Sequence, residues 1–295
     1  MGLCVTSSET MILSAILPLL PFVQSPVLLS LDGKIFIADQ NGAEERFVAN
    51  SDLACWSPDQ SKIVLERENS IFILDLKGRE TAIWKAAEGA EITGLTWGPS
   101  SAQATVSSVA DALAGSSILF SVQSRSGASI YQIVPEQGSR ATRLDWLTSF
   151  TGLRFAEVDH PSWSPSGDHL AFTVNGDLWM ANRIAPEDGS LGGWVSGRVA
   201  AAASYDGGTC YGSHWTTVVS KIVWAPNEGS LAYTLTRIGG SGVDEVYRLR
   251  LNFGEDRQVT EQGRLVSDQS HDMYFDQSGN LHYRIESAWK VDNNG

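Results

Sequence analysis

The chain has 295 residues, of which 42% are apolar and 19% are charged, and its formal net charge is −13 at pH 7. This length allows one large domain with a sizeable core, and the composition excludes a disordered chain and a membrane bundle. An acidic protein lacks the basic surface that phosphate binding requires, which argues against nucleic acid and anionic membranes as partners. The 10 Trp and 28 Gly are typical of many short strands joined by frequent turns.

The N-terminal segment 1–25 has two interpretations. An apolar run extends from Met11 to Ser25, about as long as a signal peptide and too short to span a bilayer. However, the first 25 residues contain no Lys or Arg, and Pro26 would follow the cleavage point. The segment is therefore either a secretory leader or a buried strand of the fold. A leader predicts a periplasmic or secreted protein. A buried strand leaves a cytoplasmic location open as well.

Repeats dominate the rest of the chain. A Trp-x-Pro phrase begins at Trp56, Trp97, Trp163 and Trp224, and a weaker copy begins at Phe275, at intervals of 41, 66, 61 and 51 residues. The Trp of each copy can pack between adjacent sheets, and the Pro fixes φ for the turn that follows. The phrase is therefore expected to end one strand and start a turn.

Two predicted strands make up the rest of each unit. The first is apolar, β-branched or aromatic, and it occurs at 26–31, 62–67, 117–122, 169–174, 230–235 and 280–285. The second alternates apolar and polar residues, and it occurs at 34–39, 70–75, 129–134, 177–182, 245–250 and 287–292. Asp32-Gly33 and Asn175-Gly176 are strong hairpin signals between the two. A short fourth strand, such as 45–49 or 257–260, completes the unit.

The predicted unit is a four-stranded antiparallel meander that occurs about six times. A single meander cannot bury both faces, whereas radial stacking of meanders buries them and leaves only short edges. The sequence therefore predicts an all-β protein, a six-bladed β-propeller of four-stranded antiparallel blades over residues 26–295, with a long solenoid as the alternative. The first unit lacks its first strand and the last lacks its fourth. Either residues 11–20 supply the missing inner strand, or the chain is a fragment of a longer protein.

The repeat pattern resembles the TolB-like, WD40-like (PD40) β-propeller repeat. It reads W-S-P-D-x-x-x-I-V/A-F followed by D-I/L-Y/W-x-x-N/D, and the copies at Trp56 and Trp163 fit it best. The copies at Trp97, Trp224 and Phe275 depart from the pattern, and the first unit lacks the phrase. The resemblance implies a scaffold that binds a protein partner in the bacterial envelope. Relatives with this repeat also include propeller lids of serine peptidases and metal-dependent polysaccharide lyases.

No catalytic motif accompanies the repeats. The sequence contains no G-x-S-x-G, H-E-x-x-H, phosphate-binding loop or dinucleotide fingerprint. We therefore assign no catalytic residue, metal ligand or cofactor, and the sequence favours a protein that is not an enzyme. The three cysteines, Cys4, Cys55 and Cys210, lack metal or redox spacing. Cys55 and Cys210 form either a disulfide or, as expected, free thiols.

One mouth of the channel is the best candidate ligand site. Polar residues precede each aromatic anchor by four or three positions, at the predicted entry of the strand that lines the channel. The candidate ligand-binding residues are Asp52, Thr93, Asp159, His160, Ser220, Lys221, His271 and Asp272. Two His and two Asp in this set would suit a metal site or an acid–base pair, whereas exposed strand entries are often simply polar. His169 and His282 lie in second strands, where packing or surface roles are expected.

Insertions supply a second candidate surface. Residues 184–219 extend the fourth unit and carry the aromatic residues Trp194, Tyr205, Tyr211 and Trp215. Aromatic side chains in a Gly-rich loop either bind a protein or glycan or pack on the blade rim. The predicted function is a non-catalytic scaffold for protein or ligand binding. The alternatives are the propeller portion of an enzyme and a carbohydrate-binding propeller.

Overall fold

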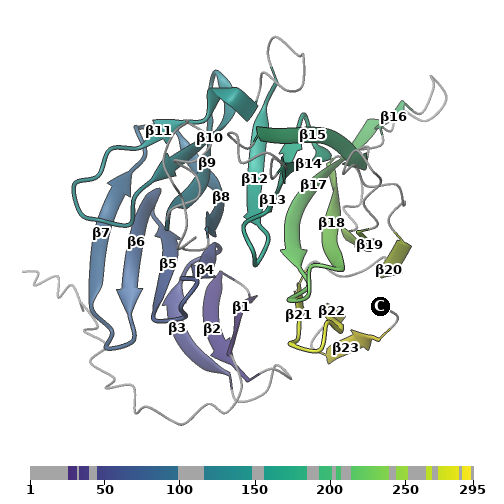
Figure 1. Ribbon diagram of the computed structural model, residues 1–295, viewed down its shortest axis with the longest axis horizontal. Helices are drawn as coiled ribbons and strands as arrows, with labels where there is room; N and C mark the ends of the chain where they lie inside the picture. Colours follow the sequence, from purple (N-terminus) through teal and green to yellow (C-terminus); the bar gives the residue numbers. More distant parts are fainter. Residues whose placement is uncertain are drawn as a thin grey trace, which may run out of the picture.

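Six antiparallel β-sheets form a ring around a central channel in the computed structural model of the chain (Figure 1). The structure describes residues 26–31, 33–39, 45–98, 116–147, 156–184, 193–200, 204–206, 214–238, 244–251, 264–267, 272–285 and 288–293. The predicted six-bladed β-propeller is confirmed, and the sheets are numbered here as blades 1 to 6 in chain order.

Every blade is a meander in which strands adjacent in sequence are hydrogen-bonded neighbours. Blade 1 contains β1 (Val27–Leu31), β2 (Lys34–Ala38) and β3 (Arg46–Asn50). Blade 2 contains β4 (Ala54–Trp56), β5 (Lys62–Arg67), β6 (Ser70–Asp75) and β7 (Glu80–Lys85). Blade 3 contains β8 (Glu91–Trp97), β9 (Ile118–Ser124), β10 (Gly127–Ile133) and β11 (Thr142–Arg143), and one helical turn follows at 145–147.

The second half of the ring is built in the same way. Blade 4 contains β12 (Val158–Trp163), β13 (His169–Val174), β14 (Asp177–Ile184) and β15 (Gly193–Ala200). Blade 5 contains β16 (Ser204–Asp206), β17 (His214–Trp224), β18 (Ser230–Ile238), β19 (Asp244–Arg250) and β20 (Arg264–Ser267). Blade 6 contains β21 (Met273–Phe275), β22 (Leu281–Ile285) and β23 (Ala288–Asp292). The sequence-predicted strand at 257–260 and the residue Asp32 lie outside the described residues.

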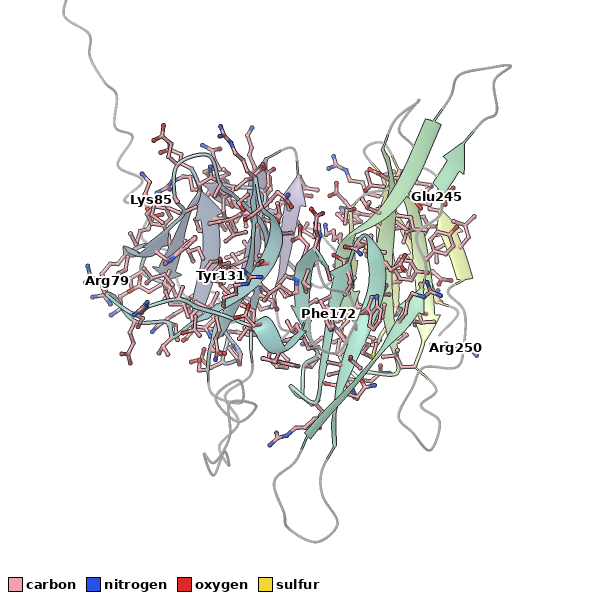
Figure 2. All side chains as sticks on the ribbon, turned by 90° about the horizontal axis from the view of Figure 1, so that it is seen from above. Arg79, Lys85, Tyr131, Phe172, Glu245 and Arg250 are labelled. Carbon is pink, nitrogen blue, oxygen red and sulfur yellow. The ribbon has the colours of Figure 1, made fainter. Side chains whose placement is uncertain are left out.

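The aromatic anchor of each repeat ends the inner strand of a blade, as predicted. Trp163 is 7% exposed and packs with Leu119 and Ile130 of blade 3. Trp224 packs in the same way with Leu178 and Met180 of blade 4. The anchors Trp97, Trp163, Trp224 and Phe275 therefore fill the space between their own blade and the preceding one. Figure 2 shows the result: Phe172 lies in the body of the molecule, whereas Arg79 and Lys85 lie at its rim.

Hydrogen bonds close the turn after the anchor. The Ser57 backbone N–H donates to the Lys62 carbonyl over 2.9 Å, and the Lys62 N–H donates to the Ser57 Oγ over 2.9 Å. The Ser57 hydroxyl donates to the Asp59 carboxylate, and this bond together with two from Ser61 lowers the pKa of Asp59.

The residue four positions after the aromatic anchor has a positive φ in four blades: 55° at Gln60, 79° at Gly167, 56° at Glu228 and 80° at Gly279. At the predicted hairpin, φ is 51° at Asn175 and 85° at Gly176, as a type I′ turn requires.

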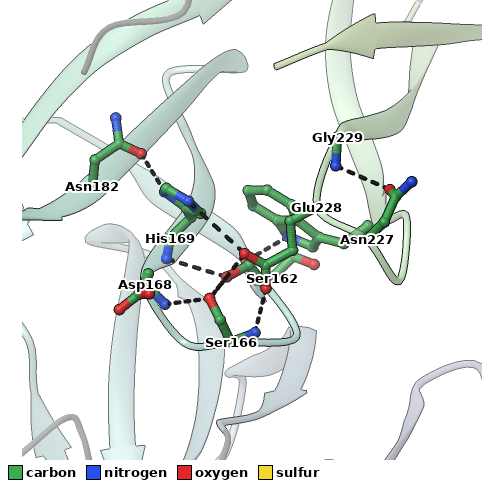
Figure 3. Close-up of polar contacts among 10 residues, drawn as sticks. Ser162, Ser166, Asp168, His169, Asn182, Asn227, Glu228 and Gly229 are labelled. Carbon is green, nitrogen blue, oxygen red and sulfur yellow. Dashed lines mark hydrogen bonds and ion pairs between the residues drawn. The ribbon is translucent and has the colours of Figure 1, made fainter. Parts of the chain in front are cut away.

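A polar cluster joins the turns of blades 4 and 5 (Figure 3). The backbone N–H of Ser166 donates to one oxygen of the Glu228 carboxylate, and the Ser166 hydroxyl donates to the other over 2.9 Å. His169 lies 3.9 Å from Glu228, bonds to Asn182 over 2.8 Å, and stacks on the Trp224 ring. Of the packing and surface roles expected for His169, these contacts show the packing role. His282 plays a similar part in blade 6, because it is 6% exposed and stacks on Tyr274.

A buried guanidinium fastens blade 6 to blade 5. Arg248 on β19 is 5% exposed, and it donates to the Asp292 side chain at 3.4 Å and to the Gly279 carbonyl at 2.9 Å. Its guanidinium also lies 5.2 Å from the centre of the Phe275 ring. One side chain of blade 5 thus contacts three parts of blade 6: β21 through Phe275, the turn after it through Gly279, and β23 through Asp292.

Side-chain packing between the first and last blades closes the ring. Leu29, Leu31 and Ala38 of blade 1 form one apolar cluster with Tyr274 of blade 6, and Trp289 packs against it. Within the described residues, blades 1 and 6 each keep three strands and do not merge into one sheet.

Replacing Trp163 with Ala should lower the free energy of unfolding by about 3–5 kcal/mol, because it removes a buried aromatic side chain between two blades. Urea denaturation of the full chain measures this loss. The matched control is Val134→Ala, since Val134 is 50% exposed and its truncation should change stability by less than about 0.5 kcal/mol. Equal effects of the two changes would show that the anchor does not hold blades 3 and 4 together.

Replacing Arg248 with Met should cost about 3–5 kcal/mol, because the Asp292 carboxylate then remains buried without its guanidinium. The double variant Arg248→Met/Asp292→Leu should recover part of that loss, since it removes the stranded charge as well. Thermal unfolding of the two variants and the wild type gives the comparison. A double variant less stable than Arg248→Met would contradict this account of the buried pair.

Candidate functional site

The centre of the ring holds a cavity of about 780 Å³. All six blades contribute to its wall, through β1, β4, β8, β12, β17 and β21 and through Trp289 of β23. The strands that carry the aromatic anchors therefore line the channel, as the sequence predicted.

Three inner strands carry a β-bulge at equivalent positions. In β8 the pairing with β9 shifts between Ile92 and Gly94, which makes Thr93 the extra residue. In β17 the shift falls between Val219 and Lys221, around Ser220, and in β12 it falls between Asp159 and Ser162. A bulge re-aims a side chain and ends regular pairing. These bulges coincide with the candidate positions before Trp97, Trp163 and Trp224.

The bulge in β12 is tightly packed against blade 3. His160 has a φ of 48°, in the left-handed region, and Pro161 follows it. A Cβ added to Gly94 of β8 would lie 2.9 Å from the His160 Cα and 2.6 Å from the Ser121 Oγ. Only glycine at position 94 lets the two inner strands approach this closely.

A hydrogen-bonded network joins blades 3 and 4 at this point. The Thr93 hydroxyl donates to the Asp159 Oδ1 over 2.7 Å and lies 3.1 Å from the Ser121 Oγ. The His160 backbone N–H donates to the same Asp159 oxygen over 2.6 Å. Ser121 is a member that the sequence reasoning missed. The only sign of Ser121 in the sequence is that it lies in the second predicted strand of its unit, at 117–122. The structure shows that it pairs with Gly94.

The imidazole of His160 is held mostly neutral near pH 7. Its side chain is 24% exposed, and its Nδ1 lies 3.5 Å from the Asp159 Oδ1. Burial lowers the pKa of His160 from its ordinary value of 6.5, and the Asp159 carboxylate opposes that shift. Ser121 contacts the backbone N–H of His160, over 3.3 Å. This arrangement differs from a serine–histidine catalytic pair, in which the hydroxyl bonds to the ring.

A second charged group lies between blades 5 and 6. The Lys221 ammonium is 3.8 Å from the Asp272 Oδ1, and Arg284 approaches the other oxygen of Asp272 within 3.7 Å. Burial lowers the pKa of Lys221, and Asp272 opposes the shift. Arg284 is the second residue that the sequence reasoning missed, because its position in β22 gives no sign that it faces Asp272.

The cavity wall includes six of the predicted candidates, namely Asp52, Thr93, His160, Ser220, Lys221 and Asp272. Asp159 joins them through its bonds to Thr93 and His160. His271 lies outside the described residues, and so do Tyr211 and Cys210. The strands of blades 4 and 5 include Trp194, Tyr205 and Trp215, and the ladder pairs Tyr205 with Trp215.

The described part of the chain contains no group of three or more His, Cys, Asp and Glu side chains that could hold a metal ion. No helix in the same residues is long and apolar enough to cross a membrane. Cys55 is a free thiol, and burial raises its pKa.

Fold and site together define a β-propeller with a polar channel mouth. No protein-family model matches the sequence, and no curated protein matches it. Among solved structures, the chain is similar to a protein from Agrobacterium tumefaciens assigned to TolB, with 15% identity and a TM-score of 0.48 over 91% of this chain and 90% of that one. It is also similar to a chain of a nidogen–laminin complex, with 12% identity and a TM-score of 0.49 over 88% and 85% of the two chains. Similarities at these levels say nothing about function.

The pKa shift of His160 makes stability depend on pH. Because the folded pKa lies below the unfolded one, the unfolded chain takes up the proton first, and stability falls as the pH drops below 6.5. The variant His160→Gln should therefore lose less stability than the wild type between pH 7 and pH 5. Urea denaturation at both pH values measures the difference. An identical loss in both proteins would show that His160 titrates normally.

Proposed function

We propose that this protein is a non-catalytic scaffold that binds a protein partner at the channel mouth. The observation that carries the proposal is the convergence of Thr93, Asp159 and His160 with Lys221 and Asp272 around one cavity. These groups come from three inner strands and from the residue just before a fourth, β21, and together they offer hydrogen-bond donors, acceptors and both signs of charge.

The chemistry of the mouth suits recognition better than catalysis. Its hydroxyls bond to each other and to carboxylates, and the described residues place no hydroxyl against the His160 ring. The wall combines these polar groups with apolar surface from Trp56, Tyr274 and Trp289. Polar groups that fix orientation within an apolar wall are typical of binding sites.

The repeat pattern and the N-terminal segment extend the proposal. The resemblance to the TolB-like PD40 repeat supports an interaction scaffold of the bacterial envelope, and a leader at residues 1–25 would support an extracytoplasmic location. A glycan is the alternative ligand, through the aromatic side chains of the 184–219 insertion. Nucleic acid does not suit a net charge of −13.

Affinity capture with the immobilised full chain tests the proposal. A partner found with the wild type should bind about 10- to 100-fold more weakly to Lys221→Met and Asp272→Asn, because each change removes hydrogen bonds to a charged group. The matched control is Lys85→Met, which removes an exposed charge on β7 at the rim (Figure 2). Equal binding to all four proteins would place the interaction elsewhere, and selective binding on a glycan array would favour the carbohydrate alternative.

A further inference from the structure

Three neighbouring blades place polar side chains at one level of the channel. His160, Lys221 and Asp272 each lie three residues before the aromatic anchor of their own repeat, and all three line the cavity. They come from β12, from β17 and from the residue just before β21. Strand β17 contacts both β12 and β21. Lys221 therefore lies in the middle of a polar arc, between a mostly neutral imidazole and a carboxylate.

The opposite wall is apolar at the same level. Leu53 of blade 2 and Gly94 of blade 3 occupy the equivalent positions, and both line the cavity. In a ring of six blades, blade 2 lies across the channel from blade 5, and blade 3 lies across from blade 6 (Figure 1). A ligand that fills the cavity at this level therefore meets a charged side and an apolar side.

The positive charge of Lys221 is only partly compensated within the described residues. Its ion-pair partner there is Asp272, at 3.8 Å, which is longer than a hydrogen bond. Arg284 shares that carboxylate at 3.7 Å, so two cationic groups face one anionic group. Burial lowers the pKa of Lys221, and the Asp272 contact does not cancel the shift. The Lys221 side chain is still 34% exposed, so its ammonium is accessible from the cavity.

We propose that Lys221 binds a carboxylate carried on an apolar group, and that the apolar group lies against Leu53 and Gly94. This inference rests on the proposed function, because it concerns the same cavity and names the chemical group of the partner that enters it. The carboxylate completes the compensation of the buried ammonium, and the apolar group removes the facing wall from water.

The charges around the arc favour a carboxylate over a phosphate. A carboxylate brings one negative charge, which matches the one excess positive charge of Lys221 and Arg284 over Asp272. A phosphate ester brings about 1.5 to 2 negative charges at neutral pH. Asp52 of blade 2 also lines the cavity and repels an anion, which favours placement of the carboxylate beside Lys221.

Binding of hexanoate to the full chain tests the site, with hexanamide as a neutral control of the same shape. Wild type should bind hexanoate at least about 10-fold more tightly than hexanamide, because bonds between charged groups are stronger than neutral ones. Titration followed by ligand-observed NMR measures both dissociation constants. Equal binding of the two compounds by the wild type would overturn the proposal. Tighter binding of inorganic phosphate than of hexanoate would also overturn it.

Three variants assign the preference to one side chain. Lys221→Met should bind hexanoate and hexanamide about equally. Lys221→Arg, which keeps the positive charge, should retain the preference for hexanoate, and so should Lys85→Met at the rim (Figure 2). A preference that survives in a folded Lys221→Met would contradict the role of Lys221, and thermal unfolding checks the fold of each variant.

Two blocked peptides identify the source of the carboxylate. Acetyl-Leu-Glu-Leu-amide should bind at least about 10-fold more tightly than acetyl-Leu-Gln-Leu-amide, because the proposed partner is a protein. Preference for hexanoate without preference between the peptides would support the carboxylate site but contradict a protein as its source. A captured partner weakened by Lys221→Met and Asp272→Asn, together with no preference for hexanoate, would overturn this inference and leave the proposed function intact.

Discussion

Contact between an aromatic anchor and the preceding blade, made at four joints of the ring, is the interaction on which the rest of the structure depends. A four-stranded meander has two apolar faces, and neither can be buried within the blade itself. Trp163 and Trp224 bury one face of their own blade and one of the neighbour at the same time. Because the same contact recurs around the ring, the inner strands are brought together, and a channel forms between them. The polar mouth exists only because this apolar packing holds the strands in place.

The mouth itself depends on a local departure from regular pairing. A regular inner strand would alternate its side chains between the two faces of the blade. The bulges in β8, β12 and β17 interrupt that alternation at Thr93, His160 and Ser220. Gly94 then allows β12 to approach β8 closely enough for Thr93 to reach Asp159. Binding groups from separate repeats thereby meet without any change in the architecture of the blades.

The sequence predicts the fold well because the fold repeats. A Trp-x-Pro phrase followed by two strands specifies a blade from local information, and the Asn175-Gly176 turn supplies its own backbone signal. The candidate site is predicted as a set of positions, since Asp52 and Ser220 lie four residues before their anchors and Lys221 and Asp272 lie three residues before theirs. Ser121 and Arg284 could not be predicted, because their roles depend on which residue faces them across a strand pair. The packing of Tyr274 on Leu29 joins opposite ends of the chain, so no local pattern encodes it.

The turn position four residues after the anchor shows how a repeat acquires individual contacts. Blades 4 and 6 place Gly167 and Gly279 there, where a left-handed backbone carries no steric penalty. Blade 5 instead places Glu228, which bears a left-handed conformation that costs roughly 1–2 kcal/mol for a residue with a Cβ. Its carboxylate accepts two hydrogen bonds from Ser166 of the neighbouring blade, and charge-assisted bonds of this kind offset that cost. The same turn position can thus hold either a glycine, which adopts the left-handed conformation without steric cost, or a side chain that bonds to the neighbouring blade. The residue at this position therefore makes the interface between blades 4 and 5 chemically different from the others, although the blades share one architecture.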